Sequence, residues 1–193
     1  DAVFTVDTDN AAWIGSLAPT YNSEGGSELL AGRWLSTSRS YIGFDTSGFS
    51  DVYAAYLRVY YYSTPGGTAD QPVVAYRAAS DSWSESTLTW NNQPGTTGPA
   101  LDTWPFTAAT SPGWVVFDVT DGFAYGGNVS FVLRAANEAV EGRLAYFYSD
   151  DDSTGEYAPQ LEVHSRGVVP EPGTLALLGL GLAGLIARRR RMG

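Results

Sequence analysis

Arginine and tyrosine alternate with aliphatic residues in segment 56–62, a pattern that could bind an acidic sugar. Successive side chains of a strand point to opposite faces, so the polar members of this segment share one face. An arginine fork donates two parallel hydrogen bonds to a carboxylate, and a tyrosine ring offers a flat surface. We therefore predict a carbohydrate-binding face formed by Arg58, Tyr60, Tyr62, Tyr76, Arg77 and Arg134. In the alternative, the arginines pair with carboxylates across strands and the tyrosines only fill the sheet surface.

Clustered acidic residues in segment 149–156 could bind a calcium ion. Asp150, Asp152 and Glu156 offer hard oxygen ligands within a short loop. Their spacing does not match an EF-hand, and a solvated acidic loop without metal is the alternative. Calcium is the one cofactor that the sequence suggests.

Two tryptophans seven residues apart, Trp83 and Trp90, could serve as sugar-stacking platforms. The structural interpretation is stronger, because a motif with this many polar residues can pack both indoles and bond its own backbone. We expect Trp90 to be the more buried of the two. We also expect Asp81, Glu85 and Asn91 to accept hydrogen bonds from the amides of this loop.

The composition argues against catalysis and against nucleic-acid binding. The chain has no cysteine, one histidine (His164) and no nucleophile-elbow serine motif. Residues 1–169 hold 20 acidic residues and seven arginines, a net charge of −13, which repels phosphate backbones. We predict a protein that is not an enzyme; a polysaccharide lyase or hydrolase is the less favoured alternative.

The elements that would position these side chains are short strands. Gly, Pro, Asn, Asp and Ser cluster between ten segments with strand character, which predicts an all-β, jelly-roll-like β-sandwich over residues 1–166. One helical turn fits within 119–125. The predicted strands are Ala2–Val6, Ala12–Ser16, Glu28–Leu35, Ser40–Asp45, Ala54–Ser63, Pro72–Ala79, Trp114–Thr120, Val129–Ala136, Arg143–Ser149 and Gln160–His164.

The last 27 residues have a different composition. A Pro/Gly linker at 167–173 precedes an apolar run at 174–187, and residues 188–193 form an arginine-rich tail. The run predicts a short C-terminal hydrophobic helix of about 21 Å, below the roughly 30 Å of a bilayer core. The arginines predict a transmembrane orientation with a cytoplasmic tail. A simple anchor is the alternative. Since the chain begins with Asp1, we also expect a removed signal peptide.

This C-terminal segment resembles the PEP-CTERM sorting signal of Gram-negative bacteria. The resemblance rests on Pro170, Glu171 and Pro172, then the apolar run, then Arg188, Arg189, Arg190 and Arg191. It implies transient anchoring in the inner membrane and cleavage near the proline pair by an exosortase, a membrane-embedded protease. The product would reach the cell surface or an extracellular polysaccharide matrix.

The body resembles DNRLRE-type domains, which are similar to carbohydrate-binding module family 96. The pattern D-x-W-x-E-x-x-x-T-W-N-N-x-P matches residues 81–94, and weaker matches extend the resemblance over roughly residues 10–165. Gly43 stands where the family commonly has arginine. The resemblance implies affinity for an acidic polysaccharide such as alginate. A structural surface protein that associates with copies of itself, without specific sugar binding, is the alternative.

Overall fold

The computed structural model describes residues 1–67 and 69–168, which form eleven strands and one turn of 3-10 helix. Every pairing between these strands is antiparallel. The elements are β1 (Ala2–Asp7), β2 (Asn10–Gly15), β3 (Glu28–Trp34), β4 (Ser36–Asp45), β5 (Phe49–Ser63), β6 (Val73–Ala78), β7 (Thr96–Trp104), β8 (Gly113–Asp118), η1 (Thr120–Gly122), β9 (Asn128–Ala135), β10 (Leu144–Tyr148) and β11 (Gln160–Val168).

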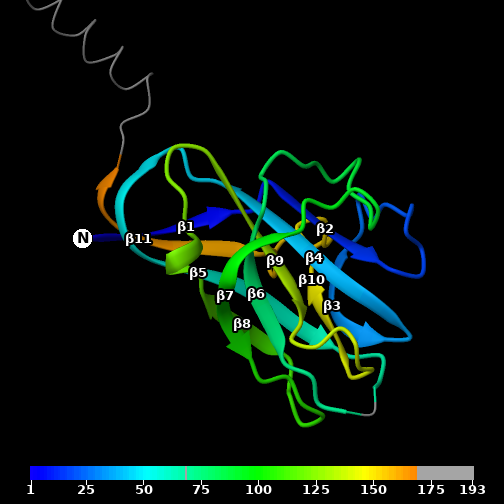
Figure 1. The fold of residues 1–193 in the computed structure, drawn as a ribbon. Helices are drawn as coiled ribbons and strands as arrows, with labels where there is room; N and C mark the ends of the chain where they lie inside the picture. Colours follow the sequence, from blue (N-terminus) through cyan, green and yellow to red (C-terminus); the bar gives the residue numbers. More distant parts are fainter. Residues whose placement is uncertain (68, 169–193) are drawn as a thin grey trace, which may run out of the picture.

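The strands form one curled sheet whose two halves pack face to face (Figure 1). One half contains β1, β11, β5, β10 and β8, and the other contains β2, β4, β9, β6 and β7. β3 joins the halves, because it pairs with β10 on one side and with β4 on the other. The predicted all-β, jelly-roll-like sandwich is confirmed.

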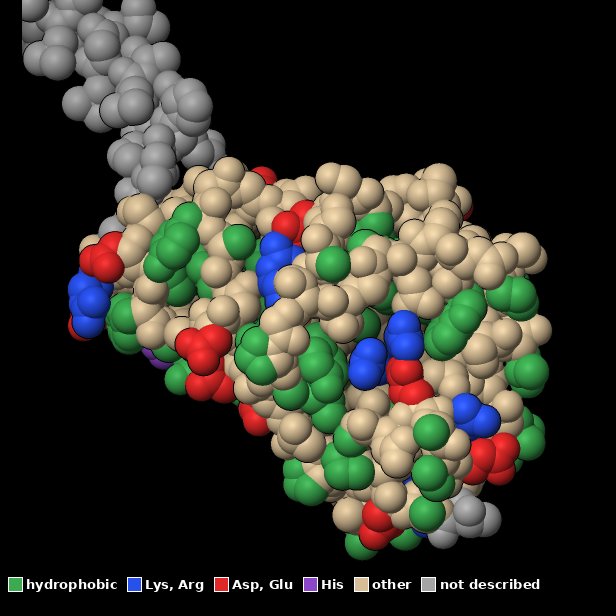
Figure 2. Space-filling model, viewed as in Figure 1, with side chains coloured by type: hydrophobic (Ala, Val, Ile, Leu, Met, Phe, Trp, Pro, Cys, Tyr) green, Lys and Arg blue, Asp and Glu red, His purple; other side chains and the backbone are tan. Residues whose placement is uncertain are grey.

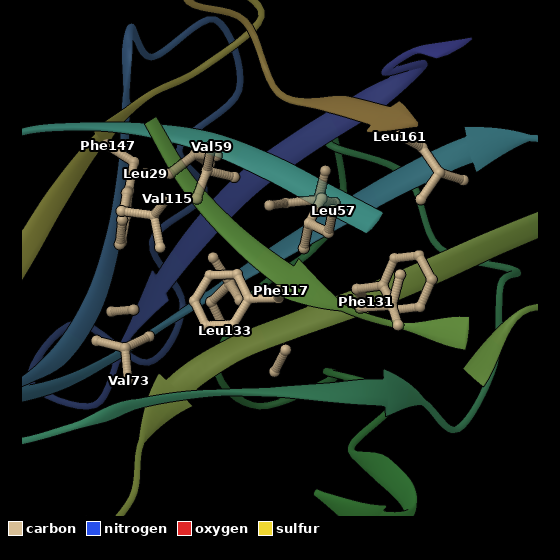
Figure 3. Packing of buried hydrophobic residues seen from close by; sticks show 14 of the residues in the cluster. Leu29, Leu57, Val59, Val73, Val115, Phe117, Phe131, Leu133, Phe147 and Leu161 are labelled. Carbon is tan, nitrogen blue, oxygen red and sulfur yellow. The ribbon is translucent and has the colours of Figure 1, made fainter. Parts of the chain in front are cut away.

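Alternating side chains of the two halves fill the interior. Leu57 and Val59 of β5 are fully buried, as are Phe131 and Leu133 of β9. Figure 3 shows side chains of β5, β8 and β9 pointing into one shared core. Each large side chain removed from water in this way contributes about 1.5–3 kcal/mol to the hydrophobic stabilisation. The alternation predicted for segment 56–62 is therefore confirmed.

All ten predicted strands are present, and β7 is the strand that the sequence patterns missed. β7 contains Gly98 and Pro99, residues that are typical of turns rather than strands. Proline is tolerated at a sheet edge, and β7 is an edge strand that pairs with β6 alone, with a register shift. β4 and β5 also begin earlier than predicted.

The loop of residues 80–95 covers the outer face of the second half of the sheet. Leu88 of the loop is buried in a second cluster with Ile14, Tyr41 and Val132, and Trp83 and Trp90 pack against it. This outer face is therefore partly covered by the loop, whereas the outer face of the half around β5 carries half-buried aromatic side chains.

The N-terminus and the end of β11 lie at the same end of the sandwich (Figure 1), where Ala2 pairs with Ser165. β11 continues through Val168, two residues into the predicted linker. Among the described residues there is no helix with the length and apolarity needed to cross a membrane. The predicted hydrophobic helix at 174–187, the arginine tail and the proline pair lie outside the described residues.

Candidate functional site

Three arginines converge on Glu138 at the end of the sheet half that contains β4 and β9. The guanidinium of Arg39, on β4, donates two hydrogen bonds to the carboxylate of Glu138, one from Nε to Oε1 at 2.7 Å and one from Nη2 to Oε2. Arg134 of β9 places its Nε 3.9 Å from the same Oε1 atom. Arg33 at the end of β3 donates from Nη1 to the backbone carbonyl of Glu138 at 2.6 Å. We call Arg33, Arg39, Arg134 and Glu138 the arginine cluster.

The register between strands explains this convergence. Ser40 pairs with Leu133, so Arg39 and Arg134 are the next residues in register and point outward together. Two like charges side by side on neighbouring strands repel each other, and Glu138 relieves that repulsion. The hydrogen bonds to Glu138 raise the pKa of Arg39 above its usual range, against the opposing effect of burial.

The arginine cluster carries more positive than negative charge. Arg39 and Arg134 share the carboxylate of Glu138, and Arg33 adds a third guanidinium group at its backbone carbonyl. Within residues 1–67 and 69–168 these arginines form ion pairs with no other acidic residue. The buried Nε atoms of Arg33 and Arg134 have no hydrogen-bond partner. About a quarter (26%) of the Arg134 side chain remains exposed to solvent. Arg134 is therefore the arginine of the ion-paired set that an anion in solution can approach most closely.

Two aromatic rings flank the arginine cluster. The guanidinium of Arg39 lies 4.8 Å from the ring centre of Trp90, and that of Arg134 lies 4.8 Å from the ring centre of Tyr76. Gln93 fixes this arrangement, since its Oε1 accepts from Arg39 Nη1 at 2.7 Å. Guanidinium groups held over aromatic faces keep their planar forks oriented.

The six residues predicted to form one binding face lie in three separate places. Tyr76 and Arg134 belong with the arginine cluster, on the outer face of β6 and β9. Arg77 is not part of the arginine cluster, because its fork binds Asp81, with Nη1 2.7 Å from Oδ1. Residues from both halves of the sandwich could not share one face. The remaining three, Arg58, Tyr60 and Tyr62, share the outer face of β5.

The outer face of β5 carries a stack of aromatic rings. Tyr62 stacks on Tyr148 at 4.5 Å between ring centres, and Tyr60 lies 4.2 Å from Tyr157. Tyr148 and Tyr157 connect the two pairs at 5.3 Å. We call these four residues the tyrosine stack. Its tyrosines are half-buried.

Arg58, beside the tyrosine stack, already has partners of its own. Its guanidinium lies over the ring of Trp114, 5.0 Å from the centre, and Nη1 is 3.7 Å from Oε2 of Glu162. The single positive charge is thus balanced by a carboxylate. This face therefore attracts an anion less strongly than the arginine cluster does.

Of the predicted calcium ligands, Asp150 alone belongs to a group of adjacent carboxylates. Its neighbours are Glu85 and Asp151, all with oxygens within 4.8 Å of one another. Burial raises the pKa of Glu85 to about 7 despite a hydrogen bond from the Ala11 amide, and burial also raises the pKa of Asp150. Asp152 and Glu156 are not in this group.

Asp152 is instead used by its own loop. Its Oδ2 accepts a hydrogen bond from the Thr154 amide at 3.2 Å, and the Thr154 hydroxyl donates to the same oxygen. Glu156 is exposed. Calcium binding stays a prediction.

Both loop tryptophans pack against the second core cluster, so each has a structural role. The indole N–H of Trp83 donates to Ser130 Oγ at 3.0 Å, and Trp90 also supports Arg39. The expected capping residues differ from those observed. Asn92, rather than Asn91, accepts from the Thr89 amide at 2.7 Å.

The two carboxylates that were expected to accept hydrogen bonds from amides of this loop instead bind groups outside it. Asp81 binds Arg77, and Glu85 accepts from the Ala11 amide of β2. Both therefore tie the loop to the sheet. A sequence motif shows which residues are polar but not which distant strand they will meet.

Sequence patterns missed Arg33, Arg39 and Glu138 as members of the site, and Trp90 was expected to have a structural role. Arg39 could have been found, because it alternates with Tyr41 and so shares the outer face of β4. Glu138 lies in the loop after β9, where no periodicity indicates direction. Figure 2 shows one face of the molecule, on which blue arginine groups lie next to red carboxylate groups.

Two family models match parts of this chain. Residues 168–191 match the PEP-CTERM protein-sorting motif. A family 35 carbohydrate binding module from Clostridium thermocellum is similar in structure at 13% identity, with 86% of this chain and 99% of that chain covered. The TM-score is 0.35, too low for conclusions about this chain. A search of the curated proteins found no match. A family model matches residues 6–165, and the chain belongs to carbohydrate-binding module family 96.

Proposed function

We propose that this protein is an exported surface or matrix protein that binds an acidic polysaccharide at the arginine cluster, without catalysing a reaction on it. Membership of a family of carbohydrate-binding modules supports the binding of a glycan. The sorting motif supports export and processing by an exosortase. In this proposal a Gram-negative cell holds the precursor in its inner membrane before releasing the body to its surface.

The observation that carries the proposal is the surplus positive charge of the arginine cluster. Elsewhere the body is strongly acidic, so a polyanion is repelled by most of the surface. At the cluster, Arg33, Arg39 and Arg134 outnumber the single carboxylate of Glu138. An anionic polymer therefore meets a local attraction in an otherwise repulsive field.

The proposed binding mechanism uses both parts of the site. A uronate carboxylate accepts hydrogen bonds from Arg134, whose side chain is the more exposed of the two paired with Glu138. Because the guanidinium groups cover the faces of Tyr76 and Trp90, the sugar ring contacts the parts of these rings that remain exposed. Since the guanidinium groups are already oriented over these rings, little conformational entropy is lost on binding.

The proposal is tested by substituting Arg134 with methionine, which keeps the length of the side chain but removes its charge. The matched control is Arg166→Met, because Arg166 is an exposed arginine at the N-terminal end of the sandwich, 3.7 Å from Asp1. Affinity electrophoresis of the full chain through gels containing alginate, other polyuronates or neutral glucans measures retardation.

We expect polyuronate to retard the wild-type chain and the Arg166→Met control, and to retard Arg134→Met much less. The loss should correspond to about tenfold in Kd, because one charge-assisted hydrogen-bonding partner contributes about 1.5 kcal/mol at a partly exposed site. Equal loss in both variants would show that total charge alone governs migration. No retardation of the wild type, with size increasing with concentration in light scattering, would favour self-association.

The export part of the proposal has its own test. Mass spectrometry of the surface form should show a C-terminus near Pro170–Pro172, without the four arginines. A surface form that retains residues 188–193 would contradict exosortase processing and support a simple anchor.

A further inference from the structure

The tyrosine stack has a geometry that favours chemistry between its own rings. The rings of Tyr62 and Tyr148 are inclined by only 23°, with centres 4.5 Å apart. Tyr148 and Tyr157 are similarly parallel, at 22°. Sheet pairing fixes this contact, because β10 lies beside β5 with Phe147 opposite Tyr61. The four tyrosines are half-buried, so small oxidants reach them while their rings stay in contact.

Tyr62 also has a proton acceptor already in place. Its hydroxyl donates a hydrogen bond to Oε1 of Glu28, which lies on β3. Burial and this hydrogen bond both raise the pKa of Tyr62, so the phenol holds its proton in the resting protein. Loss of an electron makes a phenol strongly acidic, and the proton can then pass to the Glu28 carboxylate without crossing solvent.

We propose that the tyrosine stack is an oxidative cross-linking site, in which a peroxide oxidant joins Tyr62 to Tyr148 by a carbon–carbon bond. Each phenol loses one electron and one proton, Glu28 receives the proton of Tyr62, and the two tyrosyl radicals couple through ring carbons ortho to their hydroxyls. The ortho hydrogens then shift to the oxygens and restore both phenols. Peroxide gains the two electrons and two protons and forms two water molecules. A peroxidase supplies the one-electron steps.

The consequence would be a covalent link between β5 and β10 on the surface of the sandwich. It would constrain residues far apart in the sequence, as a disulfide does, in a chain that has no cysteine. The inference is independent of the proposed glycan site, because the arginine cluster contains none of these residues.

The experiment exposes the dilute full chain to hydrogen peroxide and a peroxidase, then digests it with trypsin. Cleavage after Arg58, Arg77, Arg143 and Arg166 places Tyr62 in peptide 59–77 and Tyr148 in peptide 144–166. We expect these two peptides joined, with the summed mass lowered by two hydrogen atoms, and dityrosine fluorescence that rises with the joined species. Fragmentation should locate the bond at Tyr62 and Tyr148.

Two variants and one control test the role of the stack. Tyr148→Phe should keep the ring packing but lose the Tyr62–Tyr148 product, and Tyr62→Phe gives the same test from the other strand. Tyr125→Phe removes a tyrosine that is 58% exposed and outside the stack, and the product should persist. Glu28→Gln should slow the reaction and make its rate depend more steeply on pH, since the proton must then go to solvent.

The inference is overturned if the tyrosines that couple are the most solvent-exposed ones and not the ones whose rings are in contact. In that case the products would join Tyr21, Tyr53 or Tyr125 of different molecules, and Tyr148→Phe would yield as much dityrosine as the wild type. Arg134→Met should react as the wild type does, whatever its glycan binding. A failure of one proposal is thus distinguishable from a failure of the other.

Discussion

Substitution of Glu138 with glutamine should lower stability and raise affinity for a polyuronate. The carboxylate holds Arg39 by a two-pronged hydrogen bond and lies 3.9 Å from Arg134. Glutamine keeps one acceptor oxygen but carries no charge. The two arginines on neighbouring strands then repel each other without compensation, while a ligand carboxylate meets less repulsion.

The structure allows both magnitudes to be estimated. Breaking a fully buried ion pair costs about 3–5 kcal/mol, and since 17% of each of the Arg39 and Glu138 side chains is exposed, we expect a loss of about 2–3 kcal/mol. For binding, a ligand carboxylate about 6 Å from the removed charge is relieved of roughly 0.7 kcal/mol of repulsion in a water-like dielectric. That corresponds to about threefold tighter binding.

Urea unfolding of Glu138→Gln measures the first effect, and calorimetric titration with an oligouronate measures the second. Affinity must be measured well below the unfolding midpoint of the variant. Opposite signs for the two effects are the distinctive result. A variant that unfolds like the wild type, or a well-folded variant with weaker binding, would refute the assignment of Glu138 as the shared counter-charge.

Three further results are expected. The pKa of Glu85 is raised to about 7 from an ordinary 4.5, so its contribution to folding stability is fully present below pH 4.5 and is lost as pH rises through 7. Urea titrations over this range should show the free energy of unfolding fall by about 1–2 kcal/mol, allowing for solvent access to the carboxyl group. Glu85→Gln should abolish this pH dependence. Gly32→Ala should prevent folding, as judged by circular dichroism, because a Cβ there would lie 2.3 Å from a backbone carbonyl oxygen. The control Gly25→Ala places its Cβ in open space and should lower the free energy of unfolding by about 1 kcal/mol. Trp83→Phe should cost about 1–2 kcal/mol in thermal unfolding, because Ser130 loses its indole partner; no change would contradict the structural role of this tryptophan.

The strands were predictable because a half-buried strand shows a regular alternation of apolar and polar residues in its sequence. Segment 56–62 shows this well, since its odd-numbered residues are buried and its even-numbered residues are only partly buried, as expected. β7 was not predictable, because an edge strand with Gly98 and Pro99 lacks that alternation. The direction of a side chain follows from its parity along the strand, so Tyr76 and Arg77 could have been separated by the same rule.

The composition of the site was harder to predict than its elements. Arg134 and Tyr76 were expected in a binding face, yet Glu138, which pairs with Arg134, and Trp90, which lies against Arg39, come from loops. Loop direction depends on tertiary contacts, such as the packing of Trp90 against the second core cluster, which no local pattern records. Likewise, Glu85 and Asp150 lie 65 positions apart in the sequence, and only the fold brings them together.

The central claim is that acidic glycan binds at the arginine cluster and not at the tyrosine-rich face of β5. The indole N–H signals of the six tryptophans in an NMR titration test this directly, because Trp90 lies against Arg39 while Trp114 lies against Arg58. With added oligouronate, we predict a saturable shift of the Trp90 signal and an unchanged Trp114 signal. A shift of Trp114 with Trp90 unmoved would contradict the account.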